Sequence, residues 1–219
     1  MATRFTNRQQ AGRQLAERVA AVAAEQRWKR PLVLALPRGG VPVGAEVAEA
    51  LHAPLDVLVA RKIGAPGHSE LGIGAIVDDD PPLFDPRSLE YLGLTEDELA
   101  FDVARERIEL RRREALYRGI RVPPEVRGRT VVLVDDGLAT GVTARAALRH
   151  LRGRDPARLV LAVPVAAPEA LVALSAETDE VICLSRPQPF HAVGLWYEDF
   201  EQTTDREVTA LLGRQPVTH

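Results

Sequence analysis

Two adjacent carboxylates stand where a run of apolar residues meets a turn of small residues. The segment 131–143 reads VVLVDDGLATGVT, so Asp135 and Asp136 follow four branched apolar residues. If a helix begins after the turn, its free N–H groups and the positive end of its dipole favour a phosphate there. Carboxylate oxygens accept hydrogen bonds from hydroxyl groups. A phosphate site beside two carboxylates therefore predicts a sugar phosphate as the ligand.

Two common nucleotide-binding motifs do not explain this segment. A P-loop requires GxxxxGK[ST], and a dinucleotide site requires GxGxxG after a strand. Neither pattern occurs at the acid pair. The simpler alternative is a strand that ends in a tight turn with two solvated aspartates. We favour the binding site, because two neighbouring acids at a buried strand end followed by a helix N-terminus form a specific combination.

Short apolar strands alternate with helices along the chain. Strands are expected at 32–36, 55–60, 71–77, 130–135, 158–166 and 180–185. Helices are expected at 11–24, 41–51, 96–118, from about 140–143, and from Pro168, with Thr95 and Glu98 forming a capping box. This order predicts an α/β fold with a doubly wound, mainly parallel twisted sheet. Ligands bind beyond the carboxyl ends of such strands, where the acid pair would lie.

Two segments do not fit the alternation of strands and helices. Residues 61–70 are polar, contain glycine and proline, and are expected to form a loop. Residues 186–219 are expected to form an irregular lobe in which Trp196, Tyr197 and Phe200 cluster.

Bulk composition excludes several classes of protein. The length of 219 residues favours one core, and the net charge of −3 provides no overall attraction for nucleic acid. The single cysteine, Cys183, excludes an internal disulfide framework and is typical of a reducing cytoplasm. No apolar run approaches the ~20 residues that span a membrane. We therefore expect a cytoplasmic protein with no membrane or nucleic-acid partner.

The segment 131–143 resembles the phosphoribosyl pyrophosphate (PRPP) signature of type I phosphoribosyltransferases. The resemblance implies one Rossmann-like domain over 1–219, with a core at about 30–185 and a small C-terminal hood at about 186–219 joined by the N-terminal helix. It implies that Asp135 and Asp136 are catalytic residues that hold the ribose hydroxyls. It also implies that the turn binds the 5′-phosphate through Gly137, Ala139, Thr140, Gly141 and Thr143. Some purine members have an aspartate where Ala139 stands, so a general base at that position is excluded here.

A second anion site is expected in LPRGGVPVG, residues 36–44. A guanidinium from Arg38 beside the bare N–H groups of Gly39 and Gly40 is suited to an anion. The segment resembles the pyrophosphate loop of the family, which often contains a cis non-proline peptide. Arg61 is expected to contribute to the same pyrophosphate site.

The predicted loop 61–70 resembles the mobile lid of the family. Orotate-type members carry Lys, His and Glu in this loop, and Lys62, His68 and Glu70 follow the same order. The resemblance implies that Lys62 and Glu70 are catalytic. The alternative is an ordinary surface loop.

The tail resembles the hood of hypoxanthine-guanine-type members. This implies that Phe190, His191 or Trp196 contacts the acceptor base and that Asp199 helps to hold a metal, mostly through PRPP. Alternatively, the tail aromatics pack on the sheet. The arginines of 96–118 are expected to form a solvated face with Glu109–Arg113 and Glu114–Arg118 pairs, or a subunit interface, rather than a nucleic-acid face.

Taken together, the residues and the resemblance predict an Mg²⁺-dependent phosphoribosyltransferase of nucleotide salvage. It would transfer ribose 5-phosphate from PRPP to a nitrogenous, purine- or pyrimidine-like acceptor and release pyrophosphate, and the family implies a homodimer. The alternative is a regulatory protein that binds PRPP without chemistry. A third option is another sugar-phosphate reaction on the same fold, because a fold does not fix a function.

Overall fold

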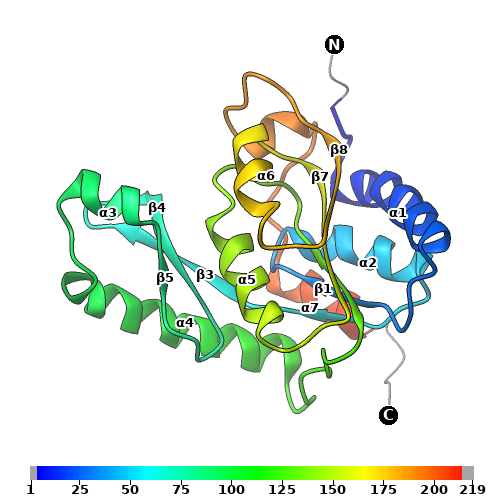
Figure 1. Cartoon of the computed structure of the whole chain (residues 1–219), viewed down its shortest axis with the longest axis horizontal. Coiled ribbons are helices and arrows are strands. Elements are labelled where there is room, and N and C mark those ends of the chain that lie inside the picture. The colour runs from blue at the N-terminus through cyan, green and yellow to red at the C-terminus, as the bar shows by residue number, and fades with distance from the viewer. Residues whose placement is uncertain (1–3, 214–219) are drawn as a thin grey trace.

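A parallel five-stranded sheet forms the centre of the molecule (Figure 1). The computed structural model describes residues 4–213, apart from the side chains of residues 69 and 70. The strands lie in the order β2-β1-β6-β7-β8. Their bounds are β1 Leu32–Ala35, β2 Leu55–Val57, β6 Thr130–Val134, β7 Arg158–Val165 and β8 Glu180–Ser185.

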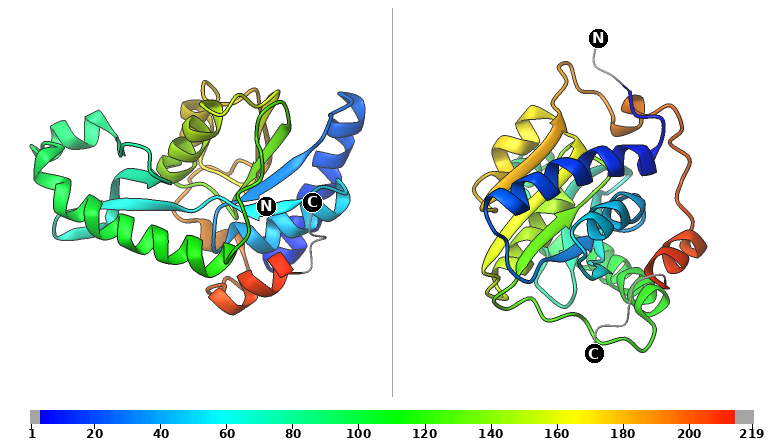
Figure 2. Two further views of the ribbon diagram at one scale, coloured as in Figure 1. Left: turned by 90° about the horizontal axis from the view of Figure 1, so that it is seen from below. Right: turned by 90° about the vertical axis from the view of Figure 1, so that its right-hand side faces the viewer.

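Helices cover both faces of this sheet, which confirms the predicted doubly wound fold (Figures 1 and 2). Helices α1 (Arg8–Glu25) and α2 (Gly40–Ala50) share one buried cluster with Val132 and Val134 of β6. Helices α5 (Val142–Arg152) and α6 (Pro168–Leu174) share the other cluster with Val131 and Leu133. Successive strand residues point to opposite faces, so a strand buried on both sides must be apolar throughout.

The connections reverse direction between β1 and β6. The chain passes from β1 through α2 to β2 on one side, and from β6 through α5 to β7 and then β8 on the other. The two central strands are aligned, with Ala35 opposite Val134 at their carboxyl ends. Such a switch point leaves a crevice beyond the strand ends, where ligands of α/β proteins bind.

The prediction of a loop at 61–70 is wrong. This segment forms a hairpin of β3 (Ala60–Ala65) and β4 (His68–Val77), and a third antiparallel strand, β5 (Leu83–Phe84), joins β4. The expected strand 71–77 therefore belongs to a second sheet. Its apolar residues Ile63 and Ile73 are fully buried in one cluster with Leu110, which explains why the hairpin forms despite its glycines.

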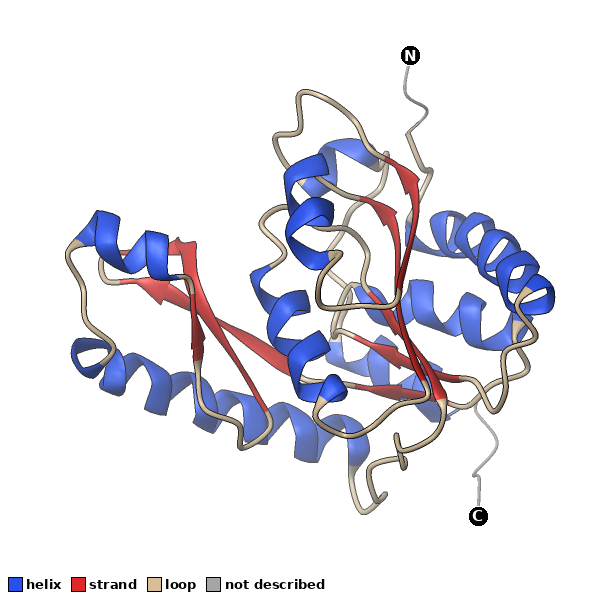
Figure 3. Ribbon diagram, viewed as in Figure 1, coloured by secondary structure: helices blue, strands red, loops and turns tan. Residues whose placement is uncertain are grey.

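We name this second sheet and its helices the arm (residues 60–118). Its helices are α3 (Pro86–Leu92), the 3₁₀ turn η1 (Asp97–Leu99) and α4 (Ala100–Arg118). The arm projects from the central sheet, to the left in Figure 3. The predicted capping box is confirmed, since Thr95 N–H donates to Glu98 at 2.8 Å. The Glu109–Arg113 pair is present at 2.8 Å, and Glu114–Arg118 at 4.0 Å.

The tail is more regular than expected. It contains the 3₁₀ turn η2 (Val193–Trp196) and the helix α7 (Asp205–Gly213). The N-terminal segment attaches to it, because Phe5 N–H donates to Trp196 O and Glu198 N–H donates to Phe5 O, both at 2.8 Å. We call residues 186–204 the hood. None of the helices in the described part of the chain combines the length and the apolar character that a membrane span requires.

Candidate functional site

The acid pair and the segment 36–40 meet at the carboxyl ends of β1 and β6. Leu36 N–H donates to Val134 O at 2.9 Å, which extends the pairing of the strands to the edge of the sheet. The peptide bond between Pro37 and Arg38 is cis, as in the loop that this segment resembles. A Cβ on Gly40 would lie 2.7 Å from Val134 O and 3.0 Å from Asp135 Cα. The predicted pyrophosphate loop therefore packs directly against the acid pair.

Gly39 is the point of closest approach between these two segments. A Cβ at this position would lie 1.9 Å from Asp136 Oδ2 and 3.2 Å from Arg8 Nε. Any side chain at position 39 would displace the carboxylate. Three parts of the chain therefore converge here: the predicted pyrophosphate loop, the acid pair and the start of α1.

The two carboxylates lie in an environment that disfavours negative charge. Burial raises the pKa of Asp135 well above its usual range, and the neighbouring charge of Asp136 raises it further. Burial also raises the pKa of Asp136, while the Arg8 guanidinium opposes that rise. The Asp136 N–H donates to Asp135 Oδ1 at 2.9 Å, which orients the first carboxylate.

Arg8 is a site residue that the sequence did not indicate. Its Nε donates to Asp136 Oδ2 at 2.7 Å, and its Nη1 donates to Glu201 O in the hood at 2.6 Å. Asn7 caps α1 by accepting from Gln10 N–H at 2.9 Å. One local feature of the sequence could have drawn attention to Arg8: it stands in the first turn of a helix that has no acidic residue in that turn.

The turn after the acid pair has the geometry expected of a phosphate cradle. Gly141 has a φ of 73°, the left-handed conformation that suits glycine, and no side chain of the described residues caps α5 behind it. The N–H groups of the first turn of α5 are therefore available to an anion. Ala139 and Thr140 are exposed, and Thr143 is half-buried.

Gly137 fixes the beginning of the same turn. A Cβ at this position would lie 2.5 Å from Val193 Cγ1 of the hood and 3.0 Å from Val165 Cγ1. Leu138 N–H donates to Val165 O at 3.0 Å, so the turn is tied to β7. The hood thus packs against the residue that directly follows the acid pair.

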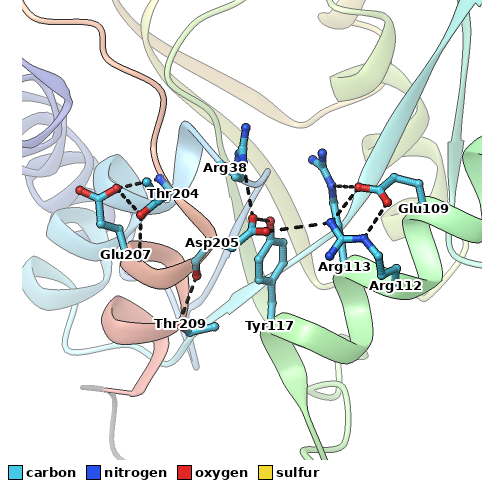
Figure 4. A network of polar contacts seen from close by, with 9 residues as sticks. All are labelled: Arg38, Glu109, Arg112, Arg113, Tyr117, Thr204, Asp205, Glu207 and Thr209. Atoms are coloured by element: carbon cyan, nitrogen blue, oxygen red, sulfur yellow. Dashed lines mark hydrogen bonds and ion pairs between the residues drawn. The ribbon is translucent and has the colours of Figure 1, made fainter.

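Arg38 is held by the C-terminal helix (Figure 4). Its Nη1 lies 3.5 Å from Asp205 Oδ1 at the start of α7. The Tyr117 hydroxyl of α4 donates to the same oxygen at 2.5 Å. This hydrogen bond and the charge of Arg38 lower the pKa of Asp205, and burial raises the pKa of Tyr117 to about 12. Helix α7 lies beside α4 in Figure 2 and so joins the arm to the predicted pyrophosphate loop.

The predicted lid residues lie on the arm. Arg61 donates to Glu106 Oε2 from Nε at 3.0 Å and from Nη2 at 2.6 Å. Lys62 lies on β3 and packs over Gly72, and Glu70 lies in β4 with its side chain outside the described part of the chain. A cavity of about 570 Å³ beside Arg61 and Lys62 is lined by arm residues. The structure does not place Arg61 beside Arg38, so their joint role stays a prediction.

The hood places two of the three predicted acceptor residues together. The rings of Phe190 and Trp196 stack with centroids 6.5 Å apart, whereas His191 is exposed. The Trp196 indole N–H is buried and has no hydrogen-bond partner among the described residues. Asp199 is exposed and accepts from Glu201 N–H at 3.1 Å. It lines a cavity of about 490 Å³ at the start of α1, beside Glu46 and Glu207.

The sequence as a whole matches the model of the phosphoribosyl transferase domain over residues 4–196, so the chain belongs to this family. A Mycobacterium tuberculosis protein, provisionally named phosphoribosyl transferase Rv0571c, is 44% identical over 212 residues, which are 96% of this chain and 46% of that protein. The chain thus spans about half the length of the curated relatives it matches. A uracil phosphoribosyltransferase of Lacticaseibacillus paracasei is 37% identical over 62 residues, 28% of this chain and 30% of that enzyme.

The crystal structure of the protein TT1426 from Thermus thermophilus has the same overall architecture. It aligns with a TM-score of 0.79 and 44% sequence identity over 97% of this chain and 99% of that one.

Proposed function

We propose that this protein is a phosphoribosyltransferase that uses PRPP and a nitrogenous heterocycle. The observation that carries the proposal is the convergence at Gly39, where the glycine loop of β1 lies against Asp136, which in turn precedes the uncapped start of α5. One ligand with a phosphate, a diol and a pyrophosphate matches these three features. Membership in the family supports the same reaction class.

In the proposed reaction, Asp135 and Asp136 accept hydrogen bonds from the ribose hydroxyls, and the turn from Gly137 to Thr143 holds the 5′-phosphate. The bond between the anomeric carbon and pyrophosphate breaks, and the pyrophosphate leaves with the electron pair. The lone pair of the acceptor nitrogen forms the new bond, and the N–H proton of the acceptor passes to water or to the released pyrophosphate. The two carboxylates stabilise the positive charge that develops on the sugar. Arg38 and the amides of Gly39 and Gly40 stabilise the leaving anion.

The donor groups of the chain fit an Mg²⁺ ion that is held mainly by the substrate. No three His, Cys, Asp or Glu side chains of the described residues gather into a metal site. Mg²⁺ commonly uses one or two carboxylates together with substrate phosphates and water. We propose Asp199 as the ligand that the chain supplies, with the oxygens of PRPP and water completing the coordination. When bound, the ion would neutralise charge on the pyrophosphate.

The hood is the proposed site for the acceptor. Phe190 and Trp196 offer a stacked aromatic pair, and the unpartnered indole N–H of Trp196 can donate to a ring nitrogen or carbonyl oxygen if the hood opens. These features suit a purine- or pyrimidine-like base. The single-domain organisation over 1–219, a homodimer and a cytoplasmic location stay predictions.

The test is pyrophosphate release from PRPP and Mg²⁺ across a panel of purine and pyrimidine bases, with calorimetric titration of PRPP in parallel. We expect saturable binding, and release that depends on one class of base. A matched variant, Gly39→Ala, should lose PRPP binding because its methyl group would displace Asp136. Binding without release for any base would favour the regulatory alternative. A wild-type protein that does not bind PRPP would overturn both.

A further inference from the structure

We infer that Arg8 is a positioning residue of the candidate site, which holds the Asp136 carboxylate in place for the ribose of PRPP. This inference rests on the proposed function. The residue lies near the start of the sequence, far from the motif that it serves, and it reaches Asp136 across 128 positions of sequence.

The contact is short, direct and shielded from water. Arg8 Nε lies 2.7 Å from Asp136 Oδ2, and the two side chains are only 12% and 14% exposed. Shielded ion pairs are seldom more stabilising than apolar side chains in the same place, because desolvation offsets most of the attraction, although loss of one partner alone is costly. A buried pair in a predicted catalytic position is therefore better explained by the orientation and charge of the carboxylate than by folding.

The position of Arg8 on its helix supports the same conclusion. It occupies the first turn of α1, where the helix dipole is positive and a cation is unfavourable. No acidic residue in that turn offsets the guanidinium. Asp136 supplies the compensating charge from another element. Gly12, one turn further along α1, would place a Cβ 3.0 Å from Val43 Cα of α2, so this close helix packing brings Arg8 to the sheet edge.

A closed ring of contacts fixes Asp136 at both its side chain and its backbone. The guanidinium of Arg8 lies 3.9 Å from the centroid of the Phe200 ring, and the rings of Phe200 and Tyr197 lie 4.9 Å apart. The Tyr197 hydroxyl donates to Asp136 O at 2.6 Å, which completes the ring. The N-terminal helix and the hood therefore hold the acid together, from two segments that the sequence places at opposite ends.

This arrangement has an electrostatic consequence for the pair of acids. Asp135 and Asp136 lie side by side in half-buried positions, and the charge of Asp136 raises the pKa of Asp135. The Arg8 guanidinium is the cation that contacts Asp136, and it opposes the effect of burial on the pKa of that group. Removal of the cation should raise the pKa of Asp136 further, so that a higher pH is needed to ionise it.

The test compares Arg8→Gln, Arg8→Lys and the control Arg13→Gln, which changes an exposed arginine on the same helix. Three quantities are measured: PRPP affinity, the pH profile of pyrophosphate release, and the titration of the Asp136 carboxyl by ¹³C NMR in the free protein. We expect Arg8→Gln to lower kcat by ~10-fold or more and to move both the acidic limb of the profile and the carboxyl titration to higher pH. Arg8→Lys should recover part of each shift, and Arg13→Gln should match the wild type.

A purely structural role for Arg8 predicts a different result. Phe200→Leu weakens the stacking on Arg8 but leaves the ion pair, so it should lower the melting temperature without moving the acidic limb. If Arg8→Gln behaves like Phe200→Leu, or if its Asp136 titration is unchanged, the positioning role is refuted while the proposed function stands. A wild-type protein that does not bind PRPP refutes the proposed function itself, and the positioning role with it.

Discussion

Two oppositely charged residues of the candidate site are each held by a counter-charge from one end of the chain. Asp136 is held by Arg8 of α1 at 2.7 Å, and these side chains are 12% (Arg8) and 14% (Asp136) exposed. Arg38 is held by Asp205 of α7 at 3.5 Å, and these side chains are 21% (Arg38) and 34% (Asp205) exposed. The first contact is short and shielded from water, whereas the second is longer and partly hydrated.

This difference separates a permanent contact from an exchangeable one. Coulomb attraction strengthens at short range and in surroundings that exclude water, so the Arg8–Asp136 pair is costly to break. The Arg38–Asp205 pair is screened by solvent, so an incoming anion can take the place of the Asp205 carboxylate. We therefore expect the acid pair to be prearranged for the ribose, and Arg38 to be released from Asp205 when pyrophosphate binds.

The largest expected effect follows from a change to Asp136, which belongs to the short contact with Arg8. Asp136→Asn keeps the shape of the side chain but removes the charge that, in the proposed reaction, faces the developing positive centre. We expect kcat to fall on the order of 10²–10³-fold, a typical loss when one preorganised electrostatic group is removed, while circular dichroism remains that of the wild type. Steady-state kinetics of pyrophosphate release measure the effect.

The matched control is Glu198→Gln in the exposed part of the hood. It removes an equal charge from an exposed side chain that has no proposed role in the site, so its kcat should stay within a few fold of the wild type. Wild-type turnover in Asp136→Asn would contradict the distinction between the permanent Arg8–Asp136 contact and the exchangeable Arg38–Asp205 contact. An equally large loss in both variants would show that the overall charge, rather than the position of Asp136, matters.

The sequence predicted the features of the site that depend on local chemistry. The continuous apolar character of β6, the following carboxylates and the small-residue turn all lie within thirteen residues, so their geometry follows from strand, turn and helix preferences. The Thr95–Glu98 capping box is local in the same way, and the structure confirms it. The role of each site residue stays a prediction.

The contacts that the sequence did not predict are long-range. Arg8 and Asp205 meet their partners because α1 packs on α2 and α7 packs on both α2 and α4, and the local sequence does not specify those partners. The hairpin at β3 and β4 was missed for another reason. Its glycines and proline are typical of loops, whereas burial of Ile63 and Ile73 beneath α4 outweighs that local preference.

The next-largest effect tests the Arg38–Asp205 contact with two substitutions, which should change the affinity for pyrophosphate in opposite directions. Arg38→Ala removes a cation from the predicted pyrophosphate loop, and we expect the affinity for inorganic pyrophosphate with Mg²⁺ to fall by ~10-fold or more. Asp205→Asn removes the competing carboxylate, and the affinity should rise by a few fold, more at low salt than at high salt. Isothermal titration calorimetry at two ionic strengths measures both.

Tyr117→Phe serves as the control for this pair of variants. It deletes the hydroxyl that orients Asp205 and leaves both charges in place, so its effect on affinity should be smaller than that of Asp205→Asn. Weaker pyrophosphate binding in Asp205→Asn would contradict the competition. Asp205 would then orient Arg38 rather than compete with pyrophosphate for it. The Arg38–Asp205 contact would have the same role as the Arg8–Asp136 contact.

The smallest expected effect is on the stability of the fold, and its sign should differ between Asp135 of the acid pair and Asp205, the partner of Arg38. The pKa of Asp135 is raised in the folded protein, mainly by burial, so the folded state loses stability as the pH rises from the unfolded pKa towards the folded one. Asp135→Asn should therefore raise the melting temperature at pH 7, by ~2–4 °C for each kcal/mol regained, although it removes a predicted catalytic group. The pKa of Asp205 is lowered, so its charge stabilises the fold above the unfolded pKa, and Asp205→Asn should lower the melting temperature.

The pH at which each stability difference disappears separates the two carboxylates further. For Asp135, the difference between variant and wild type should vanish as the pH falls to the unfolded pKa, and for Asp205 as it falls through the folded pKa. Calorimetric melts from ~pH 2 to ~pH 8 measure these shifts, because this range extends below the ordinary pKa of an aspartate, ~3.9. A lower melting temperature for Asp135→Asn at pH 7 would mean that hydrogen bonds to the carboxylate outweigh the cost of burying its charge.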